Sequence, residues 1–395
     1  MNPMHTAQPT PLHDRPLLLA AAVNVAGFLL LALLLQPVYG TVEDVYVLYQ
    51  LAGGFGTAPS ALVHYNHIMN PLLGYPLCWL FGAAPSVNWY SAALLLGHFF
   101  SGTTILYCLL RAAPRLPALL LFAAYFCVFE ARSFDSLNFT NTALLLVLSG
   151  LLLLLTESRL DRMRRKTVMS AVLLIAAGSL FRIHSWLPLL PLFVPFLFAL
   201  NDGKRRLRVA AITVAALVLV LLLHGFRRLQ YNRALPGWKA EEAYRQQVYG
   251  FYNNRNIRFP AASEKNYLES EMLRQGLVAD GALLTPKVLC ELAANTAAPA
   301  ARIRVNRWLF VNNRIFFLTL LLPLLFVTTK RVLILWGAAT LTVLVLWLGL
   351  QWFFGKAPDY LLQGMLATVF LATLCSNVRW RTTPVLLLLL PLLLA

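Results

Sequence analysis

Long apolar runs recur along the whole sequence. One example is "PLLLAAAVNVAGFLLLALLLQP" at residues 16–37, and a run of about 17–25 such residues is long enough to cross a bilayer as an α-helix. The chain is 59% hydrophobic and only 12% charged, whereas a soluble protein of this size has about one quarter of its residues charged. The sequence therefore predicts an all-α polytopic membrane protein.

About eleven transmembrane helices are expected. Their predicted positions are 16–37, 87–110, 116–131, 140–156, 167–182, 186–200, 209–226, 308–328, 332–353, 361–376 and 383–395. The segment 61–83 is apolar too, but it contains His64, Asn66, His67, Asn70 and two prolines. Polar and Pro-interrupted segments of this kind suit the membrane interface, so interfacial helices are expected there rather than another span.

The basic loops predict the orientation. "RAAPR" (111–115), "ESRLDRMRRK" (157–166), "NDGKRRLR" (201–208), "TKR" (329–331) and "RWR" (379–381) all fall on one side of this threading. Loops rich in Lys and Arg stay in the cytoplasm, while residues 38–86 contain neither and form the first outward loop. The net charge of +17 is explained by these loops, and nucleic-acid binding is not expected.

Three regions follow from this threading. Residues 1–226 form a transmembrane module, residues 227–307 a helical extracytoplasmic loop region, and residues 308–395 the C-terminal transmembrane helices. The middle region holds 7 of the 16 acidic residues of the chain. It is too small and broken to be an independent enzyme, so we expect it to pack on the outer face.

Few charges outside the middle region face outward, and they come from separate connections between helices. They are Glu43, Asp44, Glu130, Arg132, Asp135, Arg182, Lys356 and Asp359, joined by His184 and by Arg314 just inside a helix. Ionisable groups near the membrane are costly and often serve substrates or ions. Helix capping is the competing interpretation for Glu43–Asp44 after Thr41, and for Asp135 before an apolar helix.

The order of these motifs resembles the GT-C superfamily of membrane glycosyltransferases. "TVEDVY" places an acidic pair in the first outward loop, where that superfamily carries a DD, DE or ED motif. "NPLLGYPLCWLFG" (70–82) is similar to the family's Pro-rich interfacial stretch, and "EARSFDSLNFTNTALLL" (130–146) to its second acidic loop. The resemblance covers residues 16–200. The segment "GWKAEEAYRQQVYGFYNNRNIRF" is similar to proteins of bacterial surface-polysaccharide loci.

This resemblance implies a multi-pass protein of the bacterial inner membrane with an extracytoplasmic active site. It would transfer a sugar from a polyprenyl-(di)phosphate donor to a glycan or lipid acceptor. A carboxylate of Asp44 or Glu43 would be the general base, with Asp44 expected to face the cavity. Asp135, with Arg132 beside it, would orient the base or bind sugar.

The leaving phosphate needs cations, for which the candidates are Arg182, Arg255 and Arg314. The side chains expected to bind sugar or acceptor are His64, Tyr65, Asn66, His67 and His184. Asp44 and Asp135 permit a divalent cation, Mg²⁺ or Mn²⁺, without requiring one.

Two other functions stay open. A transporter or flippase for a lipid-linked glycan would place polar residues in the middle of the membrane, where the predicted spans have almost no charge. A polysaccharide polymerase or ligase of another membrane fold would also use outward arginines, as in "NNRNIR" (253–258).

Overall fold

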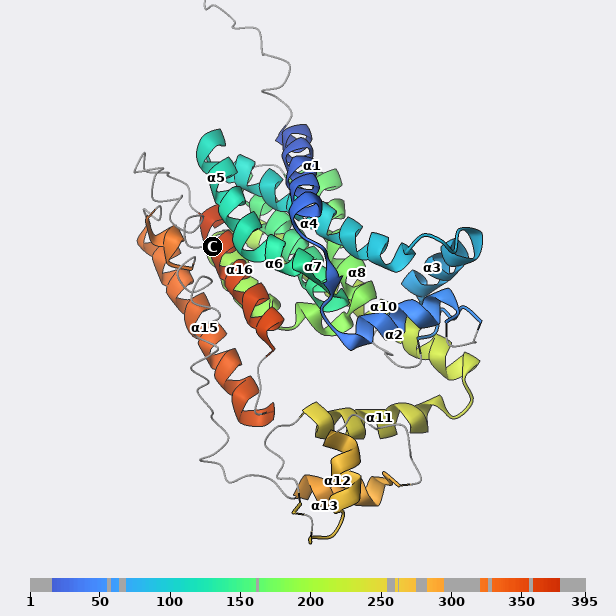
Figure 1. Ribbon diagram of the computed structural model, residues 1–395. Coiled ribbons are helices and arrows are strands. Elements are labelled where there is room, and N and C mark those ends of the chain that lie inside the picture. Colours follow the sequence, from blue (N-terminus) through green and yellow to red (C-terminus); the bar gives the residue numbers. More distant parts are fainter. Residues whose placement is uncertain are drawn as a thin grey trace, which may run out of the picture.

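The protein is built almost entirely from helices (Figure 1). The computed structural model describes residues 16–54, 58–63, 69–160, 163–253, 260–261, 263–274, 283–294, 320–325, 329–354 and 358–376.

The first half of the chain contains most of the long helices. Its elements are α1 (Pro16–Leu34), β1 (Val38–Tyr39), α2 (Val42–Ala52), α3 (Pro71–Ala83), α4 (Trp89–Ala112), α5 (Arg115–Tyr125), the π-helix η1 (Phe126–Glu130), α6 (Ala131–Asp135), β2 (Ser136–Leu137), α7 (Phe139–Ser158), α8 (Arg165–Phe181), the 3₁₀-helix η2 (Ile183–Trp186) and α9 (Leu190–Ala199).

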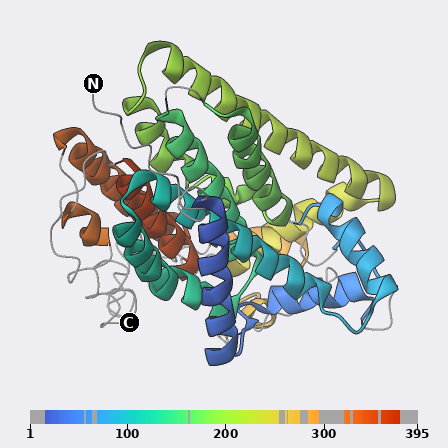
Figure 2. The same ribbon diagram turned by 90° about the horizontal axis from the view of Figure 1, so that it is seen from above.

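The second half begins with the longest helix, α10 (Gly203–Ala234). It is followed by α11 (Trp238–Asn253), α12 (Tyr267–Arg274), α13 (Pro286–Ala294), the 3₁₀-helix η4 (Leu322–Leu325), α15 (Lys330–Phe354) and α16 (Asp359–Ser376). Figures 1 and 2 place α15 and α16 on the opposite side of the helix bundle from α2 and α3.

Seven helices in the described part of the chain are long and apolar enough to cross a membrane: α1, α4, the continuous helix Arg115–Asp135, α7, α10, α15 and α16. They confirm the all-α, membrane-protein character that the apolar runs predict. Helix α8 has 17 residues and α9 only 10. Most of the expected span 308–328 and all of 383–395 lie outside the described residues, so the count of eleven stays a prediction.

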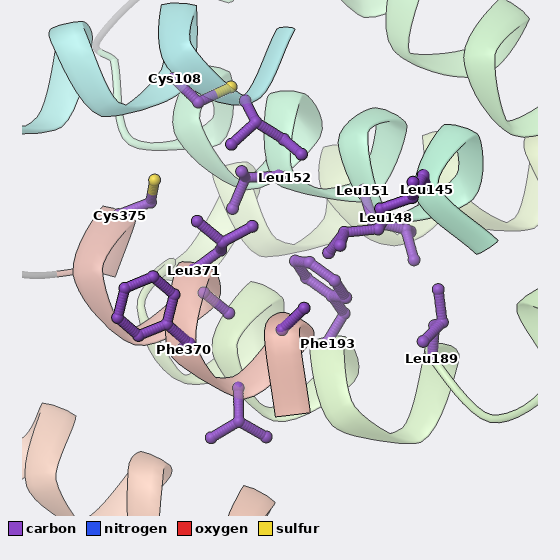
Figure 3. Close-up of a cluster of buried hydrophobic side chains, with 14 of the residues drawn as sticks. Cys108, Leu145, Leu148, Leu151, Leu152, Leu189, Phe193, Phe370, Leu371 and Cys375 are labelled. Carbon is purple, nitrogen blue, oxygen red and sulfur yellow. The ribbon is translucent and has the colours of Figure 1, made fainter. Parts of the chain in front are cut away.

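Helix α7 is the centre of the bundle, because every one of its residues is buried. Its sequence is apolar on all sides, as expected for a helix surrounded by other helices. Figure 3 shows leucines of α7 in one core with Phe193 of α9 and with Phe370 and Leu371 of α16. The outer helices differ, since Leu33 of α1 is 84% exposed and is expected to contact lipid.

Two glycines let α7 and α8 pack closely. A Cβ atom at Gly150 of α7 would lie 2.6 Å from the carbonyl oxygen of Ala171, and one at Gly178 of α8 would lie 2.7 Å from that of Ala143. Small residues at such contacts allow helix backbones to approach each other inside a membrane.

Different connections between helices meet the two ends of α7. Its first residue, Phe139, meets Asp44 of α2, whereas Ser158 at its last residue meets Asn201 before α10. A helix of 20 residues is about 30 Å long, close to the thickness of the hydrocarbon core. The basic segments near residues 157–166 and 201–208 therefore lie at the opposite end from Glu43, as the sequence predicts.

The predicted interfacial segment is short and is tied to the end of α10. Helix α3 has 13 residues with Asn70 as its N-cap, too few to cross the hydrocarbon core. The Asn70 amide also donates to the carbonyl of Leu223, and the Tyr231 hydroxyl donates to the carbonyl of Val63. After α10, which continues to Ala234 and so past the predicted boundary at residue 227, helices α11, α12 and α13 share a small apolar cluster of their own.

Candidate functional site

Asp44, in the first turn of α2, is buried and hydrogen-bonded. Helix α2 begins after Thr41, whose hydroxyl caps it by accepting from the Asp44 amide. The Asp44 carboxylate in turn accepts from the Thr41 hydroxyl at 2.5 Å, the Tyr90 hydroxyl at 2.7 Å and the Phe139 amide at 3.0 Å. The side chain thus joins the starts of α2, α4 and α7, and the capping interpretation of the acidic pair is confirmed.

Burial determines the acidity of this carboxyl group. Asp44 is 0% exposed, and loss of hydration raises its pKa from 3.8 to about 6, against the opposing effect of its three hydrogen bonds. A carboxylate with a pKa near neutrality suits a general base. Asp44 does not line any of four cavities that the described residues form, so the expectation that it faces a cavity stays a prediction.

The first turn of α7 connects Asp44 with Arg182. The Arg182 guanidinium donates to the Thr140 hydroxyl and lies 5.6 Å from the centre of the Phe139 ring. Because the amide of the same Phe139 donates to Asp44, consecutive residues of α7 touch the predicted base and the predicted phosphate-binding cation. The structure therefore brings these two candidates to one place.

Arg182 lines a cavity of about 450 Å³. The residues around this outer cavity are Thr140, Leu144, Arg182, His184, Ser185, Leu187, Pro188, Leu346, Leu350, Pro358, Tyr360, Leu361 and Met365. Polar groups come from α7 and from the connection between α8 and α9, while α15 and α16 supply mainly apolar side chains. Among the described residues, no carboxylate forms an ion pair with Arg182.

Two more basic side chains, those of His184 and Arg227, belong to the region of the outer cavity. Partial burial lowers the pKa of His184, and the charges of Arg182 and Arg227 lower it further. The imidazole is therefore neutral at pH 7 and able to donate a hydrogen bond. Arg227 of α10 is buried and lies 3.8 Å from a carboxylate oxygen of Glu242 in α11. Sequence reasoning missed Arg227 as part of this region because it assigned the residue to the loop beyond a predicted span.

The other predicted acids and cations have different surroundings. Glu43 is half-buried in the first turn of α2, whereas Arg132 and Asp135 in α6 are exposed. Parallel pairing of β1 with β2 brings the start of α2 near Asp135. Within the described ranges, no group of three or more His, Cys, Asp or Glu side chains is arranged to hold a metal ion.

Several predicted site residues lie outside the described part of the chain. They are His64, Tyr65, Asn66, His67, Arg255 and Arg314. Their roles therefore remain predictions.

A buried ionisable cluster was also missed. Nδ1 of His98 in α4 lies 2.8 Å from a Glu130 oxygen, and the Tyr125 hydroxyl donates to the other oxygen at 2.9 Å. His98 and Glu130 are both 0% exposed, so the Glu130 side chain lies inside the bundle, and the membrane side expected for it stays a prediction. Its helix continues through the π-helix to Asp135, which keeps Glu130 inside the bundle. The sequence did contain a signal for this pair, because each of two apolar runs includes one ionisable residue.

Neither a protein-family model nor a curated protein nor a solved structure matches this chain, so its residues and their geometry alone carry the functional assignment.

Proposed function

We propose that this protein is a GT-C-like membrane glycosyltransferase. It transfers a sugar from a polyprenyl-(di)phosphate donor to a glycan or lipid acceptor on the extracytoplasmic face of the bacterial inner membrane. The observation that carries the proposal is Arg182, which lines an amphipathic cavity and forms no ion pair within the described part of the chain.

The cavity suits a lipid phosphate in both size and character. Its volume of about 450 Å³ lies within the usual range of ligand sites. A guanidinium group matches the oxygens of a phosphate, while Leu350 and Met365 on the other walls suit an isoprenoid chain. As the sugar leaves the phosphate, negative charge grows on the oxygen that is released, and Arg182 would stabilise that charge.

The acidic pair supplies the base in this proposal. An acceptor hydroxyl must lose a proton as it attacks the anomeric carbon, and a positioned carboxylate accepts it. Asp44 has a suitable pKa of about 6, but its hydrogen bonds must rearrange before it can contact an acceptor. Glu43, half-buried one residue earlier, is the alternative base, with Asp44 then holding α2 against α7.

The buried His98–Glu130 pair favours a second candidate, a transporter of a lipid-linked glycan. Ionisable pairs inside spans often belong to proton or ion pathways. In proteoliposomes, such a protein would move the lipid-linked substrate from one leaflet of the membrane to the other without releasing its sugar. A glycosyltransferase would instead release polyprenyl phosphate from a monophosphate-linked donor, or polyprenyl diphosphate from a diphosphate-linked donor.

A binding measurement tests the phosphate site and does not require the identity of the sugar. Purified full-length protein in detergent is titrated with polyprenyl phosphate and with the uncharged polyprenol. Arg182→Gln should weaken binding of polyprenyl phosphate by about 10- to 150-fold and leave polyprenol unchanged, since a hydrogen bond to a charged group contributes about 1.5–3 kcal/mol. Arg182→Lys should have an intermediate effect because it keeps the charge and loses the planar fork.

Arg233→Gln is the matched control, because Arg233 is an exposed arginine in the last turn of α10 and does not line the outer cavity. It should bind as the wild type does. Equal binding of polyprenyl phosphate by wild type and Arg182→Gln would remove the basis of the proposal.

A further inference from the structure

A second cavity lies at the other end of the bundle. Its volume is about 410 Å³, and it is formed by the connection between α7 and α8, the connection between α9 and α10, and the first turns of α10. The lining residues are Leu160, Met163, Leu200, Asp202, Lys204, Arg205 and Arg208. We call it the basic cavity.

The basic cavity is fixed at the far end of α7 from Arg182. The side-chain amide of Asn201 donates to the Ser158 hydroxyl, which ties the start of α10 to the last residue of α7. The length of α7, about 30 Å, separates the two cavities. This distance places the basic cavity at the level of the phospholipid headgroups on the predicted cytoplasmic side.

Positive charge dominates this cavity. Among the described residues, three cationic side chains line it against the one carboxylate of Asp202, and that carboxylate lies 3.9 Å from Arg206. Asp202 is the N-cap of α10, yet its side chain makes no capping hydrogen bond. The first amides of α10 therefore point toward this end of the helix without a side-chain acceptor from the N-cap, an arrangement that favours an anion.

The apolar part of the cavity fits a lipid. Leu160, Met163 and Leu200 line it beside the cations, and Leu207, between Arg206 and Arg208 in α10, is 73% exposed. A phosphate near Lys204 and Arg208 would leave the attached glycerol and acyl groups against these apolar side chains. A basic pocket between helices on the cytoplasmic side is a known way to hold an anionic headgroup.

We propose that the basic cavity binds a phosphate group, carried by an anionic phospholipid of the surrounding leaflet or by a soluble phosphate compound. This site is independent of the proposed sugar transfer, since it lies at the opposite end of α7. It would fix the α7–α8 and α9–α10 connections to the membrane surface.

The test compares two triple variants of the full-length protein with the same loss of charge. The cavity variant is Lys204→Gln, Arg205→Gln and Arg208→Gln. The surface variant is Lys166→Gln, Arg111→Gln and Arg165→Gln, whose parent side chains are exposed at the same end and do not line the basic cavity. Each protein in detergent is titrated with phosphatidylglycerol, phosphatidylcholine or inorganic phosphate, and its thermal unfolding is followed.

Phosphatidylglycerol should raise the unfolding temperature of the wild type and the surface variant more than phosphatidylcholine does. The cavity variant should need at least tenfold more phosphatidylglycerol for the same shift, since each basic residue near anionic lipid contributes about fivefold. If inorganic phosphate produces the shift and competes with the lipid, the source is a soluble phosphate compound. If it has no effect, the source is the lipid.

The proposal would be overturned if the cavity variant and the wild type needed the same concentration of phosphatidylglycerol for the same shift. It would also be overturned if the surface variant needed as much additional lipid as the cavity variant. If the cavity variant does not fold, the charge-retaining variant Lys204→Arg, Arg205→Lys and Arg208→Lys is compared with Lys204→Gln alone. The former should titrate closer to the wild type, because it keeps all three charges, and the latter should need about fivefold more lipid than the wild type. No difference between them would also contradict the site.

Discussion

The carboxylate of Asp44 accepts a hydrogen bond of 3.0 Å from the backbone amide of Phe139, a residue 95 positions later in the chain. The first amides of a helix have no partner within the helix; the N-cap Asn138 accepts from the Asn141 amide, and Asp44 accepts from the Phe139 amide from another element. The negative charge of the Asp44 carboxylate also lies at the N-terminus of α7, which is the positive end of the helix dipole. The first loop is thereby attached to the most buried helix of the bundle.

Two substitutions at Asp44 separate chemistry from structure. Asp44→Asn keeps the shape of the side chain and an acceptor oxygen but removes the base. If Asp44 is the base, turnover in a transfer assay should fall by about 10²–10⁴-fold while the protein folds normally. Asp44→Ala should in addition destabilise the protein by several kcal/mol, since the Phe139 amide and Tyr90 hydroxyl lose their acceptor and each buried unpaired group costs about 1–3 kcal/mol.

Glu43→Gln is the matched comparison, because it changes the neighbouring acid in the same turn of α2. Its effect on turnover should be smaller than that of Asp44→Asn. A dead Glu43→Gln beside an active Asp44→Asn would assign the base to Glu43. Full activity in both, at normal protein levels, would contradict a base in this pair.

Stability should depend on pH through Asp44. Its pKa is raised from 3.8 to about 6 in the folded protein, so the folded state binds this proton more tightly than the unfolded state does. The resulting stabilisation is complete below pH 3.8 and is lost as the pH rises through 6, by about 3 kcal/mol in total. Thermal unfolding of the wild type and of Asp44→Asn should be compared at pH 5 and pH 8.

Asp44→Asn has no proton to lose at this position, so its stability relative to the wild type should increase between pH 5 and pH 8. A stability difference between the two proteins that stays constant over this range would show that the carboxyl group does not titrate there.

The His98–Glu130 pair should contribute strongly to stability. His98→Phe leaves the buried Glu130 carboxyl without its histidine partner, and breaking a buried pair on one side costs about 3–5 kcal/mol. The double variant His98→Phe and Glu130→Leu removes both ionisable groups and should lose less than the sum of the two single substitutions. Chemical denaturation of all four proteins in one detergent measures this, and strict additivity would argue against an interaction.

Local signals explain why part of this site could be predicted. The capping of α2 by Thr41 depends on neighbouring residues, and the distribution of Lys and Arg was enough to place Asp44 and Arg182 at the same end. Contacts between helices are different, because they depend on how each helix is rotated. The contact of Asp44 with Phe139 and the pair His98–Glu130 therefore could not be read from spacing.

The lengths of the helices show a second reason why the structure differs from what the sequence predicts. The segment 186–200 reads as one apolar span, but it contains Pro188, Pro191 and Pro195. Proline removes an amide donor and disfavours a helical conformation in the residue before it. The structure accordingly has a 3₁₀ turn, Ile183–Trp186, followed by a helix of 10 residues, and this break forms one wall of the outer cavity.

The contact between α7 and α8 should control the position of Arg182, which directly follows α8 as its C-cap. Gly150→Ala would place a Cβ atom 2.6 Å from the carbonyl oxygen of Ala171. Backbone cannot move aside as a flexible side chain can, so the helices must separate, at a cost of about 1–3 kcal/mol.

Gly337→Ala in α15 is the control, because its Cβ would meet no atom within 4 Å and alanine is the better helix former by about 1 kcal/mol. Gly150→Ala should therefore lower the unfolding temperature and weaken binding of polyprenyl phosphate, whereas Gly337→Ala should leave both unchanged or raise the unfolding temperature. Wild-type behaviour of Gly150→Ala in both measurements would show that this close contact does not set the geometry of the site.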